Sequence, residues 1–200
     1  MSLFPMFLKL EGRKCVIVGA GKIASAKAAG LLRCGARLTV IGPQATTWVR
    51  KQAAAGKLIW RAREFRRGDV SGALLAVAAT NSTATNEAVF RACQGSHVLC
   101  NVIDDPARCD FFYPSIVRRG PLQIAISTAG ASPSLARRLR QELEQQFGPE
   151  YAAWLQHVGQ LRRQVLQQEL SPGKRKQRIQ QISSPQALQE FLAGRKPMKG

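Results

Sequence analysis

The chain has 200 residues, 45% of them hydrophobic, and carries a formal net charge of +18 at pH 7. Length and composition predict a globular protein of one or two domains and exclude a low-complexity chain. The basic charge predicts an anionic partner, which is nucleic acid, an acidic membrane surface or a polyanionic small molecule, unless it is only a solvated surface.

The cysteines, the histidines and the apolar stretches indicate which kinds of site and which cellular location are possible. The five cysteines are scattered, without a Cys-x-x-Cys pair, which predicts reduced thiols in a cytoplasmic protein rather than disulfides or a zinc ribbon. Only two histidines are present, far apart in sequence, so no metal site is predicted. The longest apolar stretch, residues 73–79, is too short to cross a bilayer, and residues 1–10 lack the basic leader and cleavage site of a signal peptide.

Strands alternate with helices over the first half of the chain. An apolar lead-in strand is expected at Phe4–Leu10. Further apolar runs predict strands at Lys14–Val18, Arg37–Ile41, Leu58–Trp60, Leu74–Ala79 and Val98–Val102. The intervening segments predict helices at Ile23–Cys34, Thr46–Ala55 and Thr83–Gln94. This alternation predicts an α/β fold, with a Rossmann-like parallel sheet domain over residues 1–113.

The first strand leads into a glycine loop. Its apolar run ends in Gly19-Ala20-Gly21, and the first helix follows directly with Ala24 in its first turn. In this strand–turn–helix context the Gly-x-Gly-x-x-Ala pattern predicts a dinucleotide site, with the pyrophosphate at the helix N-terminus. A plain strand-to-helix turn is the alternative.

The end of the second strand lacks the acidic residue that normally binds the adenosine ribose in this fold. It reads Ile41-Gly42-Pro43-Gln44, and Gln44 is the candidate to bond the ribose hydroxyls instead. No arginine is adjacent to receive a 2′-phosphate. NAD is therefore the predicted cofactor, although the loop does not decide between NAD and NADP.

Two aspartates close the strand at Val98–Val102. Ligands of open parallel sheets bind beyond the carboxyl ends of the strands, so Asp104 is a candidate general acid or base. Asp104-Asp105-Pro106 is also good turn chemistry, and both interpretations stand.

The pattern changes after Asp105. Strands at Ser115–Arg119 and Leu122–Ser127 predict an antiparallel pair, and Ser132-Pro133 predicts the start of a helix that runs to Gln146. Residues 114–147 are too few to form a core alone, so we expect them to pack against a second copy in a homodimer.

Residues 148–200 predict a basic helical C-terminal domain. Its last fifty residues carry nine Lys or Arg against two Asp or Glu. Helices are expected at Tyr151–Leu170, Gln177–Ile182 and Gln186–Leu192, followed by a disordered tail over residues 195–200.

A loop of small residues, Ser127 to Pro133, enters the helix that starts at Pro133. Its hydroxyl and N–H groups are suited to carboxylates or phosphate. Arg137, Arg138 and Arg140 follow near the start of the helix, where cations oppose the helix dipole, so either ligand contact or a solvated face explains them.

In their order and spacing, these motifs resemble the precorrin-2 dehydrogenase family, the dehydrogenase/ferrochelatase part of siroheme synthase. The resemblance covers about the first 145 residues. It rests on Phe4-Pro5-Met6-Phe7, the Gly19 loop, Ala78-Ala79-Thr80-Asn81, Cys100-Asn101-Val102-Ile103-Asp104, Phe112-Tyr113-Pro114-Ser115, Ile126 to Pro133, and Leu135-Ala136-Arg137.

The resemblance implies a homodimer that uses NAD to oxidise precorrin-2, a tetrapyrrole polycarboxylate, to sirohydrochlorin. Some members also insert ferrous iron to give siroheme. Asp104 would be the general base and, in the members that also insert iron, would assist chelation. The implied cofactor contacts are Gly19, Gly21, Lys22, Ile23, Pro43, Gln44, Thr80 and Asn81. The candidate substrate contacts are Asn101, Ser127, Thr128, Gly130, Ser132 and Arg137.

Two departures from the family pattern have consequences. Ala129 replaces a glycine that many relatives have, so the geometry of its loop is expected to shift. The 200 residues leave no room for the methyltransferase domain of the fused siroheme synthase, so this chain is not expected to make precorrin-2.

The sequence leaves two other functions open. One is an NAD-sensing regulator with a basic tail on nucleic acid, which is disfavoured because the tail lacks a recognition helix or an aromatic stacking platform. The other is a different NAD-linked oxidoreductase with a small acidic substrate.

Overall fold

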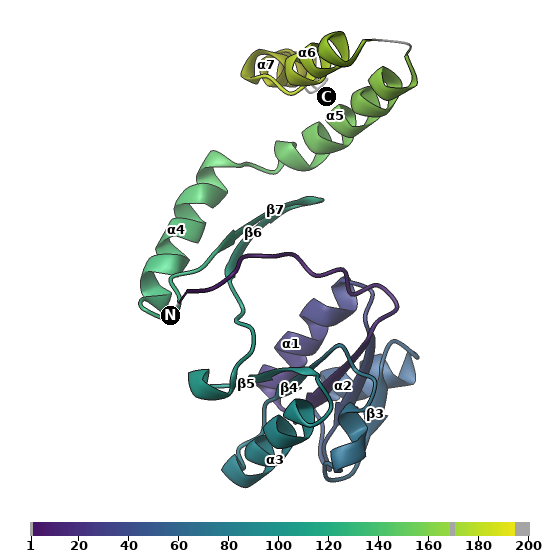
Figure 1. The fold of residues 1–200 in the computed structure, drawn as a ribbon, viewed down its shortest axis with the longest axis vertical. Coiled ribbons are helices and arrows are strands. Elements are labelled where there is room, and N and C mark those ends of the chain that lie inside the picture. The colour runs from purple at the N-terminus through teal and green to yellow at the C-terminus, as the bar shows by residue number, and fades with distance from the viewer. Residues whose placement is uncertain (1, 169–170, 195–200) are drawn as a thin grey trace, which may run out of the picture. The chain divides into compact units, whose positions relative to one another are not determined.

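The computed structural model describes residues 2–168 and 171–194 (Figure 1). Their contacts divide the chain into two compact units. Phe4–Tyr113 forms one unit, and the residues from Pro114 onward form the other together with Ser2 and Leu3.

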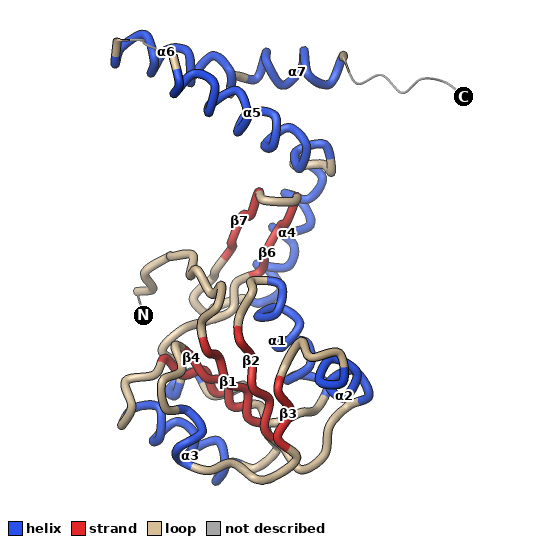
Figure 2. Tube along the Cα trace, turned by 90° about the vertical axis from the view of Figure 1, so that its right-hand side faces the viewer, coloured by secondary structure: helices blue, strands red, loops and turns tan. Residues whose placement is uncertain are grey.

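The first unit is built on a parallel five-stranded sheet with the order β3-β2-β1-β4-β5. Its strands are β1 at Lys14–Val18, β2 at Arg37–Ile41, β3 at Ile59–Arg61, β4 at Leu75–Ala78 and β5 at Leu99–Val102. Four of these strands, β1 to β4, are labelled in Figure 2. The chain passes from β1 to β2 on one side and later returns to β4 on the other side. In such a doubly wound sheet, ligands bind at this switch point, beyond the carboxyl ends of the strands.

Helices cover both faces of the sheet. They are α1 at Lys22–Arg33, α2 at Thr47–Ala54 and α3 at Thr83–Gln94, with short 3₁₀ turns η1 at Arg67–Val70 and η2 at Pro106–Arg108. Ile17 belongs to a core with Ala28 of α1, whereas its neighbour Val16 belongs to a second core with Val89 of α3. Alternate residues of one strand thus enter opposite cores, which is why the strands are apolar throughout.

The second unit starts with an antiparallel strand pair, β6 at Ser115–Arg119 and β7 at Leu122–Ile126. Four helices follow: α4 at Pro133–Gln146, α5 at Glu150–Gln167, α6 at Pro172–Ile182 and α7 at Pro185–Ala193. Arg119 of β6 satisfies carbonyl groups at the end of α4, because its Nε donates to Phe147 O at 2.7 Å and its Nη2 to Glu144 O at 2.9 Å.

The predicted fold class is confirmed, and most predicted elements are present. The prediction of a lead-in strand at Phe4–Leu10 is wrong: the segment is irregular, it pairs with none of the described strands, and its Phe4 is 81% exposed. Helix α6 begins at Pro172, not Gln177, because proline is favoured in the first turn of a helix and here starts one. The predicted end of a helix at Leu170 and the predicted tail at 195–200 lie outside the described residues. Within the described part of the chain, no helix combines the length and hydropathy that crossing a bilayer requires.

Candidate functional site

A cavity of about 370 Å³ opens at the carboxyl edge of the five-stranded sheet. Its walls are the loops that follow β1, β2 and β4, together with a segment that follows β3. Its lining residues are Val18, Gly19, Ala20, Gly21, Ile41, Gly42, Pro43, Gln44, Glu64, Phe65, Ala79, Thr80, Asn81, Ser82 and Thr85. The cavity therefore lies at the switch point of the sheet.

Gly19 lies in the turn directly after β1 and lines this cavity. Its φ is +105°, and an added Cβ would lie 2.2 Å from the carbonyl oxygen of Ala79. The Gly19 N–H also donates to Ile41 O at 2.8 Å, which ties the loop to β2. Only glycine permits this backbone at this distance from the β4 loop.

The N-terminus of α1 fits a pyrophosphate. Gly21 occupies its N-cap without any side-chain cap, whereas Thr46 and Ser82 cap α2 and α3 with their hydroxyls. An added Cβ at Gly21 would meet nothing within 4 Å, so the space beside this helix end is open. Unpaired N–H groups and the positive end of the helix dipole favour an anion there, and the residues present therefore fit a dinucleotide.

Six of the eight predicted cofactor residues line the cavity: Gly19, Gly21, Pro43, Gln44, Thr80 and Asn81. Lys22 and Ile23 do not line it. They form the first turn of α1, where their backbone N–H groups face the same helix end and their side chains are exposed.

The loop after β4 is held in place by α3. Thr80 Oγ1 donates to Asn86 Oδ1 at 2.7 Å, and Asn86 Nδ2 donates back to Thr80 O at 3.0 Å. Sequence reasoning missed Asn86, although an asparagine in the first turn of the following helix is a usable signal. This exchange fixes the loop that presents Asn81 to the cavity.

Asp104 lies two residues beyond β5, exposed, with a φ of +61°. It makes no hydrogen bond or ion pair with any described residue, whereas Asp105 forms an ion pair with Arg108. The Asp105 N–H also closes the turn onto Val102 O at 3.2 Å. Asp104 is therefore itself part of the turn that follows β5, while its carboxylate has no partner among the described residues.

Lys27 of α1 interacts electrostatically with Asp104. Burial lowers the pKa of Lys27, and the charge of Asp104 opposes that shift. The Lys27 ammonium also lies 3.7 Å from the centroid of the Tyr113 ring. Asp104 therefore lies in the field of a cation that has its own aromatic partner.

Asn101 is buried in β5 and has mainly internal contacts. Its Nδ2 donates to Phe111 O at 2.8 Å and to Cys109 Sγ at 3.2 Å, while its Oδ1 has no hydrogen-bond partner within the part of the chain that the structure describes. These contacts favour a structural role for Asn101, in which it anchors the segment at 109–111.

The loop from Ser127 to Pro133 belongs to the second unit and satisfies many of its own polar groups. Thr128 Oγ1 donates to Ser132 O at 3.1 Å, and Ser132 Oγ accepts from Leu135 N at 3.2 Å to cap α4. Ser127 Oγ accepts from Ala129 N at 3.1 Å. Ala129 and Gly130 both have positive φ, at +50° and +84°. The loop is therefore a preformed turn.

The three arginines of α4 differ in their partners. Arg138 pairs with Glu142 at 3.2 Å, and Arg140 pairs with Glu144, each one helical turn away. Arg137 is exposed and has no ion-pair partner among the described residues. A solvated, paired face thus explains two of the arginines and leaves Arg137 as the candidate for an anionic ligand.

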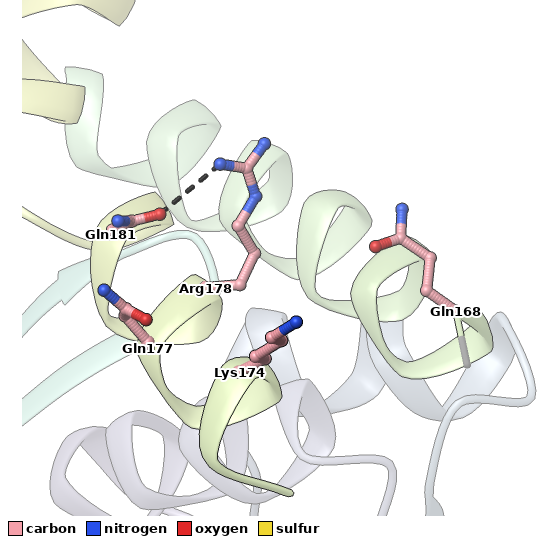
Figure 3. Close-up of a pocket in the computed structure, with 5 residues that line it drawn as sticks. All are labelled: Gln168, Lys174, Gln177, Arg178 and Gln181. Carbon is pink, nitrogen blue, oxygen red and sulfur yellow. Dashed lines mark hydrogen bonds between the residues drawn. The ribbon is translucent and has the colours of Figure 1, made fainter. Parts of the chain in front are cut away.

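A second cavity, of about 370 Å³, lies between the end of α5 and α6 (Figure 3). Two cations and three amides line it: Lys174, Arg178, Gln168, Gln177 and Gln181. Arg178 Nη1 donates to Gln181 Oε1 at 3.4 Å. Among the described residues that line it there is no nucleophile or general base, and the sequence did not predict this cavity.

A doubly wound sheet with a glycine loop and an uncapped helix at its switch point defines an NAD(P)-binding protein of the Rossmann class. Residues 6–115 match the model of an NAD(P)-binding family, NAD_binding_7, and residues 119–146 match a second family model, "Sirohaem biosynthesis protein central". The chain belongs to the precorrin-2 dehydrogenase family, which corresponds to the N-terminal part of siroheme synthase.

Individual relatives agree with this assignment. The chain is 39% identical over 197 residues to a siroheme synthase of Escherichia coli O157:H7, covering 96% of this chain and 42% of the relative. It is 37% identical over 193 residues to siroheme synthase 1 of Aeromonas salmonicida, covering 96% and 41%. The chain thus spans about two fifths of the length of these relatives.

The fold is that of a solved structure of similar length. SirC, a precorrin-2 dehydrogenase, matches with a TM-score of 0.83 and 27% sequence identity over 96% of this chain and 98% of that one. The family predicted from the sequence motifs is confirmed.

Proposed function

We propose that the chain oxidises precorrin-2 to sirohydrochlorin with NAD as the hydride acceptor. The observation that carries this proposal is the cavity at the switch point, with its Gly19 turn and uncapped α1, in a chain that aligns with nearly the whole of a precorrin-2 dehydrogenase. NAD, when bound, supplies the redox chemistry by accepting a hydride from a ring carbon of the substrate.

The side chains of the protein supply position and charge. The N-terminus of α1 binds the pyrophosphate, and Thr80 and Asn81 orient the nicotinamide end of the cofactor. Loss of a hydride leaves a proton to be removed from the substrate, and Asp104 accepts it. Arg137 and the loop at Ser127–Ser132 hold substrate carboxylates, which the charge of +18 also attracts to the protein.

Two matched aspartate variants test this assignment. In Asp104→Asn, the rate at which the sirohydrochlorin spectrum appears should fall by roughly 100-fold or more, which is the lower range for loss of a general base. The Kd for NAD should not change. Asp105→Asn removes the same charge one residue away and should keep turnover within a few-fold. Unchanged turnover in Asp104→Asn contradicts the role of Asp104, and absence of turnover in the wild type contradicts the proposed function.

Insertion of ferrous iron is a separate proposal, since Asp104 is also the residue that the family resemblance implicates there. Ferrous iron added to enzymatically formed sirohydrochlorin should produce the siroheme spectrum faster with the wild type than with Asp104→Asn. Equal rates for the two proteins contradict the role of Asp104 in iron insertion, and a wild-type rate no faster than that without protein contradicts the activity itself.

We also propose a homodimer that forms through residues 114–147. Strands β6 and β7 make a two-stranded sheet, which is marginally stable on its own, and Leu135 of α4 is 38% exposed. Light scattering after size-exclusion chromatography should give twice the monomer mass, and a monomer at micromolar concentration contradicts the proposal.

We further propose that the chain divides into residues 1–113, 114–147 and 148–200. The match of residues 119–146 to a separate family model supports this division.

The five cysteines are free thiols, which supports a cytoplasmic location. Fractionation of the producing cells checks it.

A further inference from the structure

We infer that Glu64 binds the ribose hydroxyls of the adenosine half of the cofactor and makes the cavity favour NAD over NADP. This inference deepens the proposed function, since it rests on the dinucleotide site of the first unit. It supplies the acidic residue that is absent after β2.

The pairing of β3 with β2 brings Glu64 to the cavity. Arg61, the last residue of β3, is opposite Ile41, the last residue of β2. The Gly42 N–H donates to Arg61 O at 3.1 Å, and Trp60 Nε1 donates to Gly42 O at 3.0 Å. The carboxyl ends of the two strands are thus held together, and the segment after β3 lines the same cavity as Pro43 and Gln44.

Two arginines of this segment, Arg61 and Arg63, are committed to Asp69. Asp69, with a side chain only 4% exposed, accepts from Arg61 Nη1 at 2.8 Å and from Arg63 Nη2 at 2.7 Å. Its second oxygen accepts from Arg63 Nη1 and from the Arg66 N–H, each at 2.8 Å. Arg63 Nη1 also donates to the carbonyl oxygen of Glu64 at 2.8 Å. One buried carboxylate therefore holds two guanidinium groups and fixes the backbone beside Glu64.

The one ionisable residue among those that line the cavity has the charge opposite to the net charge of the chain. Of the fifteen lining residues, Glu64 alone is ionisable under ordinary conditions, although the whole chain carries +18. A carboxylate accepts hydrogen bonds from the 2′- and 3′-hydroxyls of a ribose but repels a 2′-phosphate. In the common form of this fold the acid follows β2, whereas here it follows β3, the next strand of the sheet.

Binding constants for both cofactors test the inference without any turnover assay. Calorimetric titration of the wild-type protein should give a Kd for NAD at least about 10-fold below that for NADP, as expected for one charge-assisted contact. Glu64→Gln should weaken NAD binding by roughly 10-fold and bring the two constants close together. Glu64→Arg should reverse the preference.

Glu87→Gln is the matched control. Glu87 is an acid on α3 that pairs with Arg91 and does not line the cavity, so its loss changes the net charge equally and should leave both constants unchanged. A wild-type preference for NADP overturns the inference, and so does an unchanged NAD-to-NADP ratio in both Glu64 variants. A wild type that binds neither nucleotide contradicts the proposed function itself, and the two failures are thereby distinguished.

Discussion

The ammonium group of Lys27 lies 3.7 Å from the centroid of the Tyr113 ring, which joins α1 to the last residue of the first unit. Tyr113 also meets Phe111 edge to face, with ring centroids 5.6 Å apart. The pair therefore fixes the end of the segment that follows Asp104 and leads out of the sheet domain.

A double-mutant cycle should measure this cation–π contact. Lys27→Met and Tyr113→Leu, made singly and together, should give a coupling energy of about 0.5–1 kcal/mol in urea unfolding. Tyr113→Phe is the control, since it keeps the ring and should keep the coupling to Lys27. A coupling energy of zero would show that the two groups contribute independently.

Gly19→Ala and Gly21→Ala should separate folding from cofactor binding. The methyl group of Gly19→Ala would meet Ala79 O at 2.2 Å in a backbone with φ +105°, so we expect a loss of stability of about 2 kcal/mol or more together with loss of NAD binding. The methyl group of Gly21→Ala would meet no protein atom within 4 Å, so unfolding should be close to that of the wild type.

Only the cofactor opposes the added methyl group at Gly21. The Kd for NAD of Gly21→Ala should therefore rise by 10-fold or more, as measured by calorimetry, despite a normal unfolding curve. Normal NAD affinity in Gly21→Ala would contradict the placement of the pyrophosphate beside this residue.

Asp69 should make stability depend on pH in the acid range. Its hydrogen bonds, first from Arg63 and then from the Arg66 backbone and Arg61, lower its pKa from 3.8 to about 2, against the opposing effect of burial. Because the pKa in the folded state is the lower one, this stabilisation is fully present above pH 4 and is lost as the pH falls towards 2. It amounts to about 2 kcal/mol.

The Asp69→Asn variant isolates this contribution from the other carboxylates. The difference in unfolding free energy between wild type and Asp69→Asn should be largest above pH 4 and should shrink between pH 4 and 2 in urea titrations. A difference that does not vary with pH would contradict the ion-pair origin of the effect.

The sequence predicts the sheet well because burial leaves a direct trace in it. Strands covered on both faces must be apolar throughout, and β1 and β2 are found at their predicted bounds. The same rule fails at Phe4–Leu10, where an apolar run pairs with none of the strands that the structure describes. A run of residues shows that a strand is possible but does not show what it would pair with.

The candidate site divides in the same way. Gly19 and Gly21 belong to a local motif, so sequence spacing places them at the cavity. Glu64 reaches the cavity only because β3 pairs with β2. This fold normally has an acid after the second strand, and that position of the sequence gives no indication of Glu64. The α4 arginines differ in a similar way. Arg138 and Arg140 each form an ion pair with a glutamate one helical turn away, and Arg137 does not.

Ala129→Gly should stabilise the protein. Ala129 has a φ of +50°, a conformation that costs a residue with a Cβ about 1–2 kcal/mol, and the adjacent Gly130 adopts positive φ without that cost. Glycine gives back roughly 0.4–1 kcal/mol through the greater entropy of the unfolded chain, so the net gain should be about 0.5–1 kcal/mol. The free energy of unfolding in urea measures it. Ala131→Gly, two residues later at a position without positive φ, is the control and should destabilise slightly. If Ala129→Gly also destabilises, the left-handed conformation at Ala129 does not carry the expected strain.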